Sequence, residues 1–313
     1  MIVLRGTKCN LPGMAPNIER KTADPQLPRR KGARRMSEIP PEVLRELNEG
    51  RLETLTLVEW LAIDGAQLSE HVARDIGLQG RDSKALVARA QLLRSEGIVQ
   101  RVKGTGATVH AILDGHSRRD EVFEALATHP SDMARTWAAY SLGADPRPPL
   151  ATRLRAVIRF ARDHSMAVRE CAWDTIRPHI ARDLKRGLEL LEPWARHEDD
   201  RVRRCAIEAT RPRGVWCAHI EELKADPEPG LRLLEHVKAD ESDSVRRSAG
   251  NWLNDASKSQ PGWVQRVCAR WIRESSDDGT AWIVQHGLRT LRKKGEATFP
   301  SSQPGRLRQG SRK

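Results

Sequence analysis

From residue 41 onward, apolar residues recur with the 3.6-residue period of amphipathic helices, and no convincing segment alternates as a strand does. The first helical segment begins with Pro41 at its first turn and stops at Gly50, as the residue preferences at helix ends favour. Helices are expected over residues 41–50, 54–66, 69–76 and 84–94. The pattern predicts an all-α protein.

The second half of the chain contains an internal repeat. The pattern D-x-V-R-x-x-x-A, or a close variant, occurs four times, with starts 34, 34 and 43 residues apart. The paired Val-Arg or Ala-Arg positions are 134–135, 168–169, 202–203 and 245–246. The Asp of this pattern is expected to cap its helix, while the Val and Ala face neighbouring helices. With a terminal repeat helix at 281–293, this predicts a HEAT-like helical repeat solenoid with a concave face.

Composition divides the chain into four segments. We expect a disordered basic N-terminal extension (1–40), an N-terminal helical region (41–115), a HEAT-like repeat domain (116–295) and a basic disordered tail (296–313). Met36 precedes a plausible helix lead-in, so we expect it to be the biological start. The alternative is that the upstream residues form a basic arm that tethers the protein to DNA.

The positive charge lies at the two ends of the chain. The formal net charge is +12; residues 1–35 contribute +7 and residues 292–313 contribute +6, which leaves −1 for residues 36–291. A body that is nearly neutral can bind a polyanion only through the arrangement of its charges.

Several classes of protein are excluded by what the sequence lacks. No apolar run reaches 18 residues, so a transmembrane protein is excluded, and the apolar start is too short for a signal peptide. Five cysteines without a C-x-x-C pair argue against a disulfide framework or a zinc module, and a reducing, cytoplasmic setting is expected. No P-loop or dinucleotide fingerprint occurs, and we expect no metal or nucleotide cofactor.

The repeat register places three acidic residues on one flank of successive inner helices. Counted from the Val of each repeat, Asp174 and Glu208 occupy position 6, and Asp255 occupies position 10 of the next repeat. Positions 6 and 10 lie one turn apart on the same side of a helix. The register thus brings these carboxylates to one groove as candidate functional groups. The alternative is that each is a surface acid paired with Arg.

Aromatic and basic residues accompany these acids. Trp173, Trp216 and Trp252 are close to them in sequence, although Trp252 also fits a core position. The basic residues that could bind phosphates lie on the inner helices or at their ends: Arg177, Arg211, Arg213, Arg246 and Arg247. Pro178 and Pro212, each after an Arg, are expected to end or kink the helices. A solvated Arg face is the alternative.

Two stretches resemble the AlkC-type DNA alkylation repair proteins. Residues 204–216 (RCAIEATRPRGVW) are similar to the A-S-E-G-x-R-P-R-x-P-W stretch of that family, and residues 244–258 (SVRRSAGNWLNDASK) are similar to S-V-R-R-S-V-A-N-N-L-N-D-I-A-K. The resemblance covers roughly residues 160–295. It implies catalytic acids at Glu208 and Asp255. The family's third acid falls on Trp173, with Asp174 one residue later.

The resemblance implies a HEAT-like monofunctional DNA glycosylase of the AlkC/AlkD superfamily, without the immunoglobulin-like domain that the AlkC branch often carries. Such enzymes hydrolyse the N-glycosidic bond of cationic alkylpurines, such as 3-methyladenine or 7-methylguanine, without a conventional flipped-base pocket. The implied partner is double-stranded DNA with alkylated bases, bound by a monomer that contacts no membrane. A non-catalytic DNA-binding HEAT protein and a protein–protein scaffold are the alternatives.

Overall fold

The computed structural model describes residues 30–297, which form helices joined by loops, with no strand in this range. The N-terminal helices are η1 (Met36–Glu38), α1 (Pro41–Asn48), α2 (Leu57–Ala62), α3 (Gly65–Asp75), α4 (Gly80–Leu92), α5 (Ile98–Leu113) and α6 (Arg119–Ala127). The later helices are α7 (Asp132–Ala144), α8 (Leu150–Ala161), α9 (Met166–Arg182), α10 (Leu184–Ala195), α11 (Asp200–Ala209), α12 (Glu221–Ala225), α13 (Glu228–Val237), α14 (Asp243–Ser257), α15 (Pro261–Glu274), α16 (Asp278–Gly287) and α17 (Arg289–Lys293). Within the described range, no helix is long and apolar enough to cross a bilayer.

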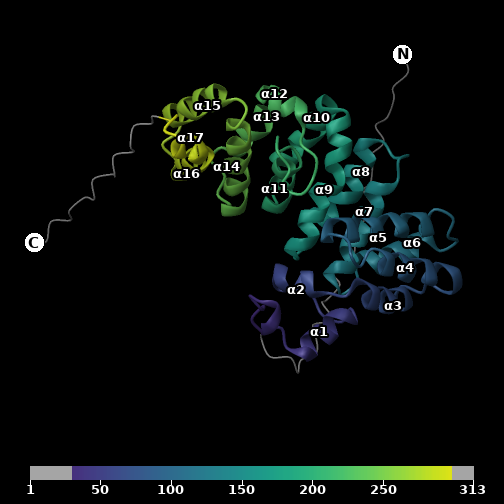
Figure 1. The fold of residues 1–313 in the computed structure, drawn as a ribbon. Coiled ribbons are helices and arrows are strands. Elements are labelled where there is room, and N and C mark those ends of the chain that lie inside the picture. Colours follow the sequence, from purple (N-terminus) through teal and green to yellow (C-terminus); the bar gives the residue numbers. More distant parts are fainter. Residues whose placement is uncertain (1–29, 298–313) are drawn as a thin grey trace, which may run out of the picture. The chain divides into compact units, whose positions relative to one another are not determined.

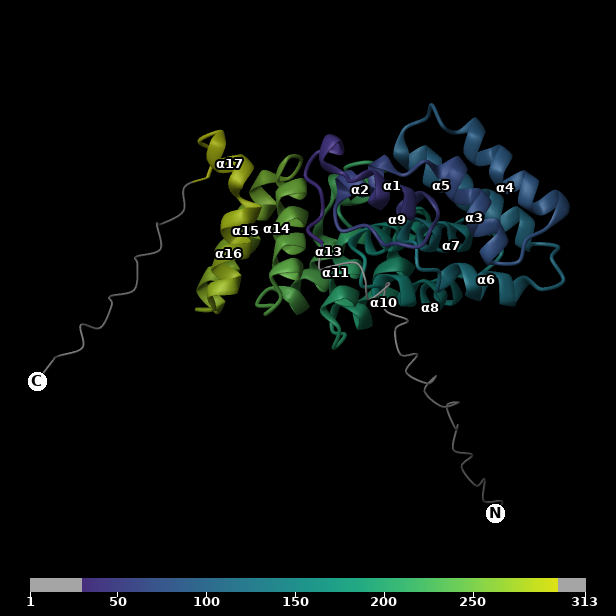
Figure 2. The same ribbon diagram turned by 90° about the horizontal axis from the view of Figure 1, so that it is seen from below.

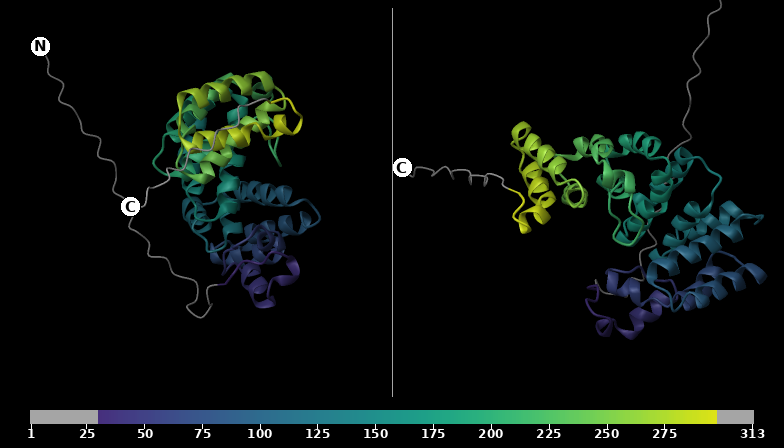
Figure 3. Two further views of the ribbon diagram at one scale, coloured as in Figure 1. Left: turned by 90° about the vertical axis from the view of Figure 1, so that its left-hand side faces the viewer. Right: turned by 45° about the horizontal axis from the view of Figure 1, so that its top comes forward.

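The helices stack in chain order, which confirms the predicted all-α, HEAT-like repeat fold (Figures 1 and 2). Helices α7, α9, α11, α14 and α16 form the inner layer, each packing on the next, while α8, α10, α13 and α15 pack outside them. Val168, Val202 and Val245 are fully buried, because the repeated Val and Ala positions face the adjacent helices as expected. Helices α15–α17 lie at the end of the stack away from α3–α6 (Figure 3).

The segment boundaries differ from the predicted ones. From Gly32 onward the chain forms one compact unit, which contains both the predicted N-terminal helical region and the repeats. Ala33 and Ile39 are buried in the core, so the folded body begins before residue 41. The helix expected over 281–293 is interrupted at Leu288 between α16 and α17. The extension is predicted at residues 1–40 and the tail at 296–313; of these, residues 1–29 and 298–313 lie outside the described part of the chain.

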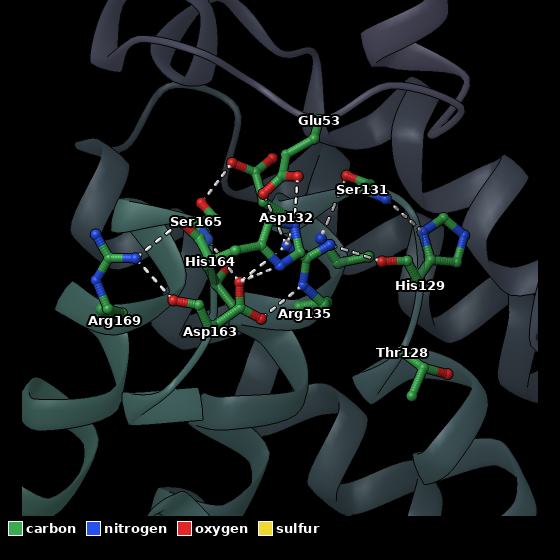
Figure 4. A network of polar contacts seen from close by, with 12 residues as sticks. Glu53, Thr128, His129, Ser131, Asp132, Arg135, Asp163, His164, Ser165 and Arg169 are labelled. Carbon is green, nitrogen blue, oxygen red and sulfur yellow. Dashed lines mark hydrogen bonds and ion pairs between the residues drawn. The ribbon is translucent and has the colours of Figure 1, made fainter. Parts of the chain in front are cut away.

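The repeated Arg is a structural clamp for the loop before its own helix. Arg135, Arg169, Arg203 and Arg246 each donate from one guanidinium nitrogen to two successive main-chain carbonyls of that loop, at 2.7–3.0 Å. Figure 4 shows this arrangement around Arg135, which also binds the carboxylate of Asp163 in the next loop. Arg203 binds Asp240 in the same manner. Two of the four periodic arginines, Arg135 and Arg203, therefore also link neighbouring repeats.

The Asp of the repeat does not cap its own helix, which corrects the sequence expectation. Asp132 and Asp200 are the first helical residues, one position after the cap. Asp132 instead accepts a hydrogen bond from the hydroxyl of Ser165 at 3.0 Å, and Asp200 accepts one from Ser242 at 2.5 Å. Both serines precede the inner helix of the following repeat. These two Asp side chains thus join consecutive repeats, and Asp132 also accepts from the main-chain N–H of Met133 in the first turn of its own helix.

Pro178 does not end its helix. Helix α9 continues through Pro178 to Arg182, whereas α11 stops at Ala209 and Pro212 lies in the loop that follows. A proline inside a helix cannot donate to the carbonyl four residues earlier, which here belongs to Asp174. The two Arg-Pro pairs therefore have different backbone settings despite their equal spacing.

Candidate active site

Glu208 on α11 and Asp255 on α14 are brought together by Arg211. The guanidinium of Arg211 donates to Glu208 Oε2 at 3.0 Å and to Asp255 Oδ2 at 2.9 and 2.7 Å. Both carboxylates are almost fully buried, at 4% and 3% exposure. The two acids predicted to share a flank therefore share one cation between adjacent inner helices.

The remaining oxygens of this pair also have partners. Glu208 Oε1 accepts a 2.6 Å hydrogen bond from the hydroxyl of Ser248, and Asp255 Oδ1 lies 3.0 Å from Lys258 Nζ. Burial by itself would lower the pKa of Arg211. The charges of Glu208 and Asp255 have the larger combined effect and raise the pKa of Arg211. The cluster is a compact ion-pair network in which neither carboxylate is left unpaired.

Asp174 on α9 lies in a separate setting supplied by N-terminal helices. Its Oδ2 lies 2.7 Å from Lys103 Nζ on α5 and accepts a 2.7 Å hydrogen bond from the Tyr140 hydroxyl on α7. Its Oδ1 is buried and accepts no hydrogen bond from the described residues. Burial, followed by charge on Cys171 and Asp174, raises the pKa of Tyr140, so this phenol remains a hydrogen-bond donor.

Sequence reasoning missed Lys103 and Tyr140. Tyr140 could have been found, because it is position 6 of the first repeat, 34 residues before Asp174. Lys103 had no such signal, since α5 lies outside the repeated pattern. Its placement depends on Gly106, where an added Cβ would lie 2.4 Å from the Tyr140 Cβ and 3.2 Å from the Trp137 carbonyl. This close contact of α5 with α7 brings Lys103 over the Tyr140 ring, 5.7 Å from its centroid.

Arg177 lies between the two acidic settings but is not available to DNA. Its side chain is only 2% exposed and donates to the main-chain carbonyls of Ala209 and Ala218. Burial lowers the pKa of Arg177, and Arg211 lowers it further, while Asp174 and Asp255 act in the opposite direction. Its predicted role in phosphate binding is therefore wrong; it anchors the loop after α11.

The three candidate tryptophans divide into one exposed ring and two buried ones. Trp216 is 48% exposed and stacks on Trp173, with ring centroids 6.3 Å apart. Trp173 is buried and donates its indole N–H to Glu170. Its ring is therefore fixed, and it forms a rigid surface against which the Trp216 ring packs. Trp252 is completely buried and donates to the main-chain carbonyl of Thr210, so the core alternative is correct and its predicted contact with substrate is wrong.

The other candidate arginines are also mostly engaged. Arg213 donates to the main-chain carbonyl of Asp255 and to Ser259, and Arg246 clamps its loop and pairs with Asp243. Both side chains therefore have protein partners in this structure, and their contact with DNA stays a prediction. Arg247, by contrast, is exposed. Its contact with DNA stays a prediction.

One cluster has the composition of a metal site. Glu53, Asp163 and His164 offer ligand atoms that lie within 4.8 Å of one another. Arg135 donates to Glu53 at 2.9 Å and to both oxygens of Asp163, so its guanidinium already lies among these carboxylates (Figure 4). The cluster ties the segment before α2 to the ends of α7 and α9, and we assign it a structural role.

Known proteins with similar sequences and folds point in one direction. The family model described as DNA alkylation repair enzyme matches residues 145–290, a range that contains Asp174, Glu208 and Asp255. The uncharacterized protein YhaZ of Bacillus subtilis (strain 168) is 40% identical over 121 residues, which are 39% of this chain and 33% of YhaZ.

Two solved structures are similar to the fold. The Pseudomonas fluorescens alkylpurine DNA glycosylase AlkC, bound to DNA containing an abasic site analog, matches with a TM-score of 0.63 and 28% identity. The match covers 74% of this chain and 64% of AlkC. AlkD2 from Streptococcus mutans has a TM-score of 0.46 and 19% identity, over 70% of this chain and 97% of AlkD2.

The chain thus spans one third of the length of YhaZ and just under two thirds of AlkC. The matched range starts at residue 145 and leaves out α1–α7, including Lys103 and Tyr140. Within it lie the stacked repeats and the paired carboxylates on α11 and α14. Over residues 145–290 the chain matches the DNA alkylation repair enzyme family, and its fold is similar to that of AlkC.

Proposed function

We propose that this protein is a DNA glycosylase that removes cationic alkylated purines, of the 3-methyladenine or 7-methylguanine type, from double-stranded DNA. The observation that carries the proposal is the buried pair Glu208 and Asp255, held on adjacent inner helices by Arg211. Similarity to a DNA-bound alkylpurine DNA glycosylase at 28% identity supports the same activity.

The chemistry requires little beyond a placed anion. Alkylation at a ring nitrogen gives the purine a positive charge, so the base leaves without being protonated by the enzyme. Positive charge then develops on the sugar, and a carboxylate beside it stabilises that charge. The same group can orient the water that attacks C1′ and accept its proton. Asp255 is our first candidate for this role, and Glu208 is the second.

DNA binding must release a carboxylate from its cations, because the site is charge-balanced in this structure. Lys258 and Lys103 are the partners best placed to leave, since their side chains are 41% and 37% exposed. A DNA phosphate within reach competes for each ammonium group. Departure of Lys258 would free Asp255 Oδ1, while Arg211 continues to hold Oδ2 and fixes the orientation of the carboxylate.

Trp216 is the candidate contact for the alkylated base. Its ring is exposed and is stiffened by stacking on Trp173. A cationic purine over an indole face gains about 0.5–2 kcal/mol from cation–π attraction. This contact favours the charged, alkylated base over the neutral, undamaged one.

A direct test uses the full chain and N-methylated duplex DNA. Released 3-methyladenine and 7-methylguanine are measured by liquid chromatography with mass detection, with no added metal or nucleotide. We expect release by the wild type and none above background from the double variant Glu208→Gln/Asp255→Asn. If the wild type releases neither base while it binds methylated DNA, the glycosylase assignment fails.

A non-catalytic DNA-binding role is the second candidate, and one observation favours it. Every oxygen of Glu208 and Asp255 is already paired with a donor, as in a purely structural ion network. A binding protein of this kind predicts affinity for alkylated DNA that does not change with the double variant. The two candidates therefore give different results in the same pair of assays.

A further inference from the structure

Arg289 and His286 contact α14 at the repeat position that carries candidate acids in the preceding repeats. This position, counted as 6 from the Val of each repeat, is Asp174 on α9, Glu208 on α11 and Asn251 on α14. The side-chain oxygen of Asn251 lies 2.9 Å from His286 Nε2 and accepts a hydrogen bond from Arg289 at 3.0 Å. The last of these repeats thus matches the other two in position but not in charge.

On α9 and α11, the cation beside this position has a carboxylate as its partner. Lys103 pairs with Asp174, and Arg211 pairs with Glu208. Arg289 contacts a neutral amide instead, and among the described residues no carboxylate forms an ion pair with it. A guanidinium also has more N–H donors than the two acceptors bound here. Arg289 therefore has both charge and donors left for a further anion.

Two neighbouring groups add to this positive charge. Arg247 is exposed and lies four residues before Asn251, so the two residues share one face of α14. Burial lowers the pKa of His286, and the nearby charges of Arg289 and Arg247 lower it further. An anion placed among these three side chains would relieve their repulsion and form charge-assisted hydrogen bonds.

Close packing of α16 on α14 holds the cluster in place. A Cβ added at Gly250 would lie 2.8 Å from His286 Cδ2, and one added at Gly287 would lie 2.8 Å from Leu253 Cβ. The similar family stretch has Ala where this chain has Gly250, so the place of His286 against α14 depends on a residue particular to this chain. The His286 ring also stacks on Trp282, with centroids 4.7 Å apart.

We propose that Arg247, His286 and Arg289 bind one phosphate of the DNA strand that carries the alkylated base, next to that base. The proposal rests on the DNA binding that the glycosylase function proposed above requires. Asp255 lies four residues after Asn251 on the same face of α14, about 6 Å further along its axis. A phosphate held here would place the adjoining sugar beside Asp255 while the base stays in the stack.

A double-mutant cycle between protein and DNA tests this contact with the full chain. On the DNA, one phosphate at a time is replaced by an uncharged methylphosphonate, on both sides of a 2′-fluorinated, hydrolysis-resistant 7-methylguanine. On the protein, Arg289→Gln and Arg247→Gln each remove one positive charge. Arg266→Gln is the matched control, because Arg266 is exposed on the outer helix α15 and forms no ion pair with the described residues.

We expect Arg289→Gln and Arg247→Gln each to raise the Kd for the unmodified backbone about tenfold, as for loss of a charge-assisted contact. The slope of log Kd against log salt should become shallower by about 1. In wild type, a methylphosphonate beside the lesion should weaken binding by a similar factor. The same replacement should have little further effect in Arg289→Gln, whereas Arg266→Gln should match wild type throughout.

A full effect of every methylphosphonate in both site variants would overturn the proposal, because the missing guanidinium would then not be the partner of any tested phosphate. Inhibition of binding by inorganic phosphate without such coupling would assign the cluster to free phosphate and would also overturn it. If Arg289→Gln is poorly folded by circular dichroism, Arg247→Gln decides alone, because its side chain is exposed.

Base release by wild type is measured separately on the ordinary lesion. Its absence would reject the glycosylase function, whereas the binding cycle would still decide whether this cluster holds a DNA phosphate.

Discussion

Helices α9 and α11 carry the same residue pattern 34 positions apart, yet matched residues have different partners. Asp174 and Glu208 occupy one repeat position, and Arg177 and Arg211 occupy another. Arg211 binds two carboxylates, whereas Arg177 is buried and binds main-chain carbonyls. The repeat determines which face of the helix a residue occupies, and the neighbouring element determines what it contacts.

The neighbours of the two helices explain the difference. Helix α11 packs against α14, and two residues of α14, Asp255 and Ser248, lie beside Glu208, the acid of α11. Helix α9 packs against α7, and α7 packs against α5. Lys103 of α5 contacts Asp174, the acid of α9. One acid therefore belongs to a pair that shares an Arg, and the other is a single carboxylate held by Lys103 and Tyr140. In the pair, departure of Lys258 would leave one carboxylate uncompensated, because the two acids would then share only Arg211.

The largest expected effect is on the rate of excision, which should depend more on the pair Glu208 and Asp255 than on Asp174. Asp255→Asn should lower single-turnover excision by roughly 100-fold, the scale of losing one electrostatic stabiliser, with Glu208→Gln close behind. Asp174→Asn should lose less than about 10-fold, because it is not one of the pair. The control is Asp243→Asn, an exposed acid on the same helix as Asp255.

Binding to methylated duplex should be retained by all four variants, which separates a loss of chemistry from a loss of affinity. Equal losses in Asp174→Asn and Asp255→Asn would show that the three acids act as one unit and would remove the distinction between the two settings.

The second prediction compares how much the loop-binding arginines of the two repeats, Arg203 and Arg169, contribute to the free energy of unfolding. Arg203 binds two loop carbonyls and both oxygens of Asp240. Among the described residues, Arg169 binds only the carbonyls of its own loop and the Met166 sulfur. Arg203→Ala should lower the free energy of unfolding by about 3 kcal/mol, and Arg169→Ala by about 1 kcal/mol.

Urea unfolding followed by circular dichroism measures both values. The comparison is fair because each Arg starts the same turn of its inner helix. A larger loss for Arg169→Ala than for Arg203→Ala would mean that the inter-repeat ion pair contributes nothing to stability.

Much of this geometry was predictable from the sequence, but only where the repeat extends. The register placed Glu208 and Asp255 on one flank, and the structure joins them through Arg211. The repeat register could not predict the contact of Lys103 with Asp174, because Lys103 lies on a helix without the repeat and is positioned by the contact at Gly106. It also misassigned Arg177 and Trp252, because their spacing does not reveal that other elements cover them.

The third prediction tests whether Asp174 depends on the N-terminal helices. Removing the ammonium in Lys103→Met leaves a buried carboxylate to which, within residues 30–297, Tyr140 still donates a hydrogen bond and no ammonium remains paired. The free energy of unfolding should fall by about 2 kcal/mol, as for loss of a hydrogen bond to a charged group. Asp174→Asn in the same background should recover part of that loss, because no charge remains to be compensated.

A double-mutant cycle measures this coupling, and about 1 kcal/mol is expected for groups in direct contact. Lys258→Met is the matched control, because it removes the ammonium group paired with Asp255. Arg211 still compensates Asp255 in this variant, so the free energy of unfolding should fall by less than in Lys103→Met. Additive effects of Lys103→Met and Asp174→Asn would show that the observed contact does not matter in solution.

The smallest expected effect concerns pH and the next matched position, His179 on α9 and Arg213 after α11. Burial lowers the pKa of His179, helped by Arg153 and Arg182, although the Gly143 carbonyl opposes them. The folded state therefore favours neutral His179, and the unfolded chain takes up the proton first as pH falls. The stabilising contribution is present above the unfolded pKa of about 6.5 and is lost as pH falls below it.

His179→Gln keeps a donor for the Gly143 carbonyl, 3.0 Å from the histidine nitrogen, but does not titrate. The free energy of unfolding of this variant should decline less than that of wild type between pH 7.5 and pH 5.5. Arg213→Gln removes a group that stays charged throughout, so the pH dependence of its stability should match that of wild type. Parallel curves for wild type and His179→Gln would mean that His179 titrates alike in the folded and unfolded chains, and that this position gives α9 no pH sensitivity that α11 lacks.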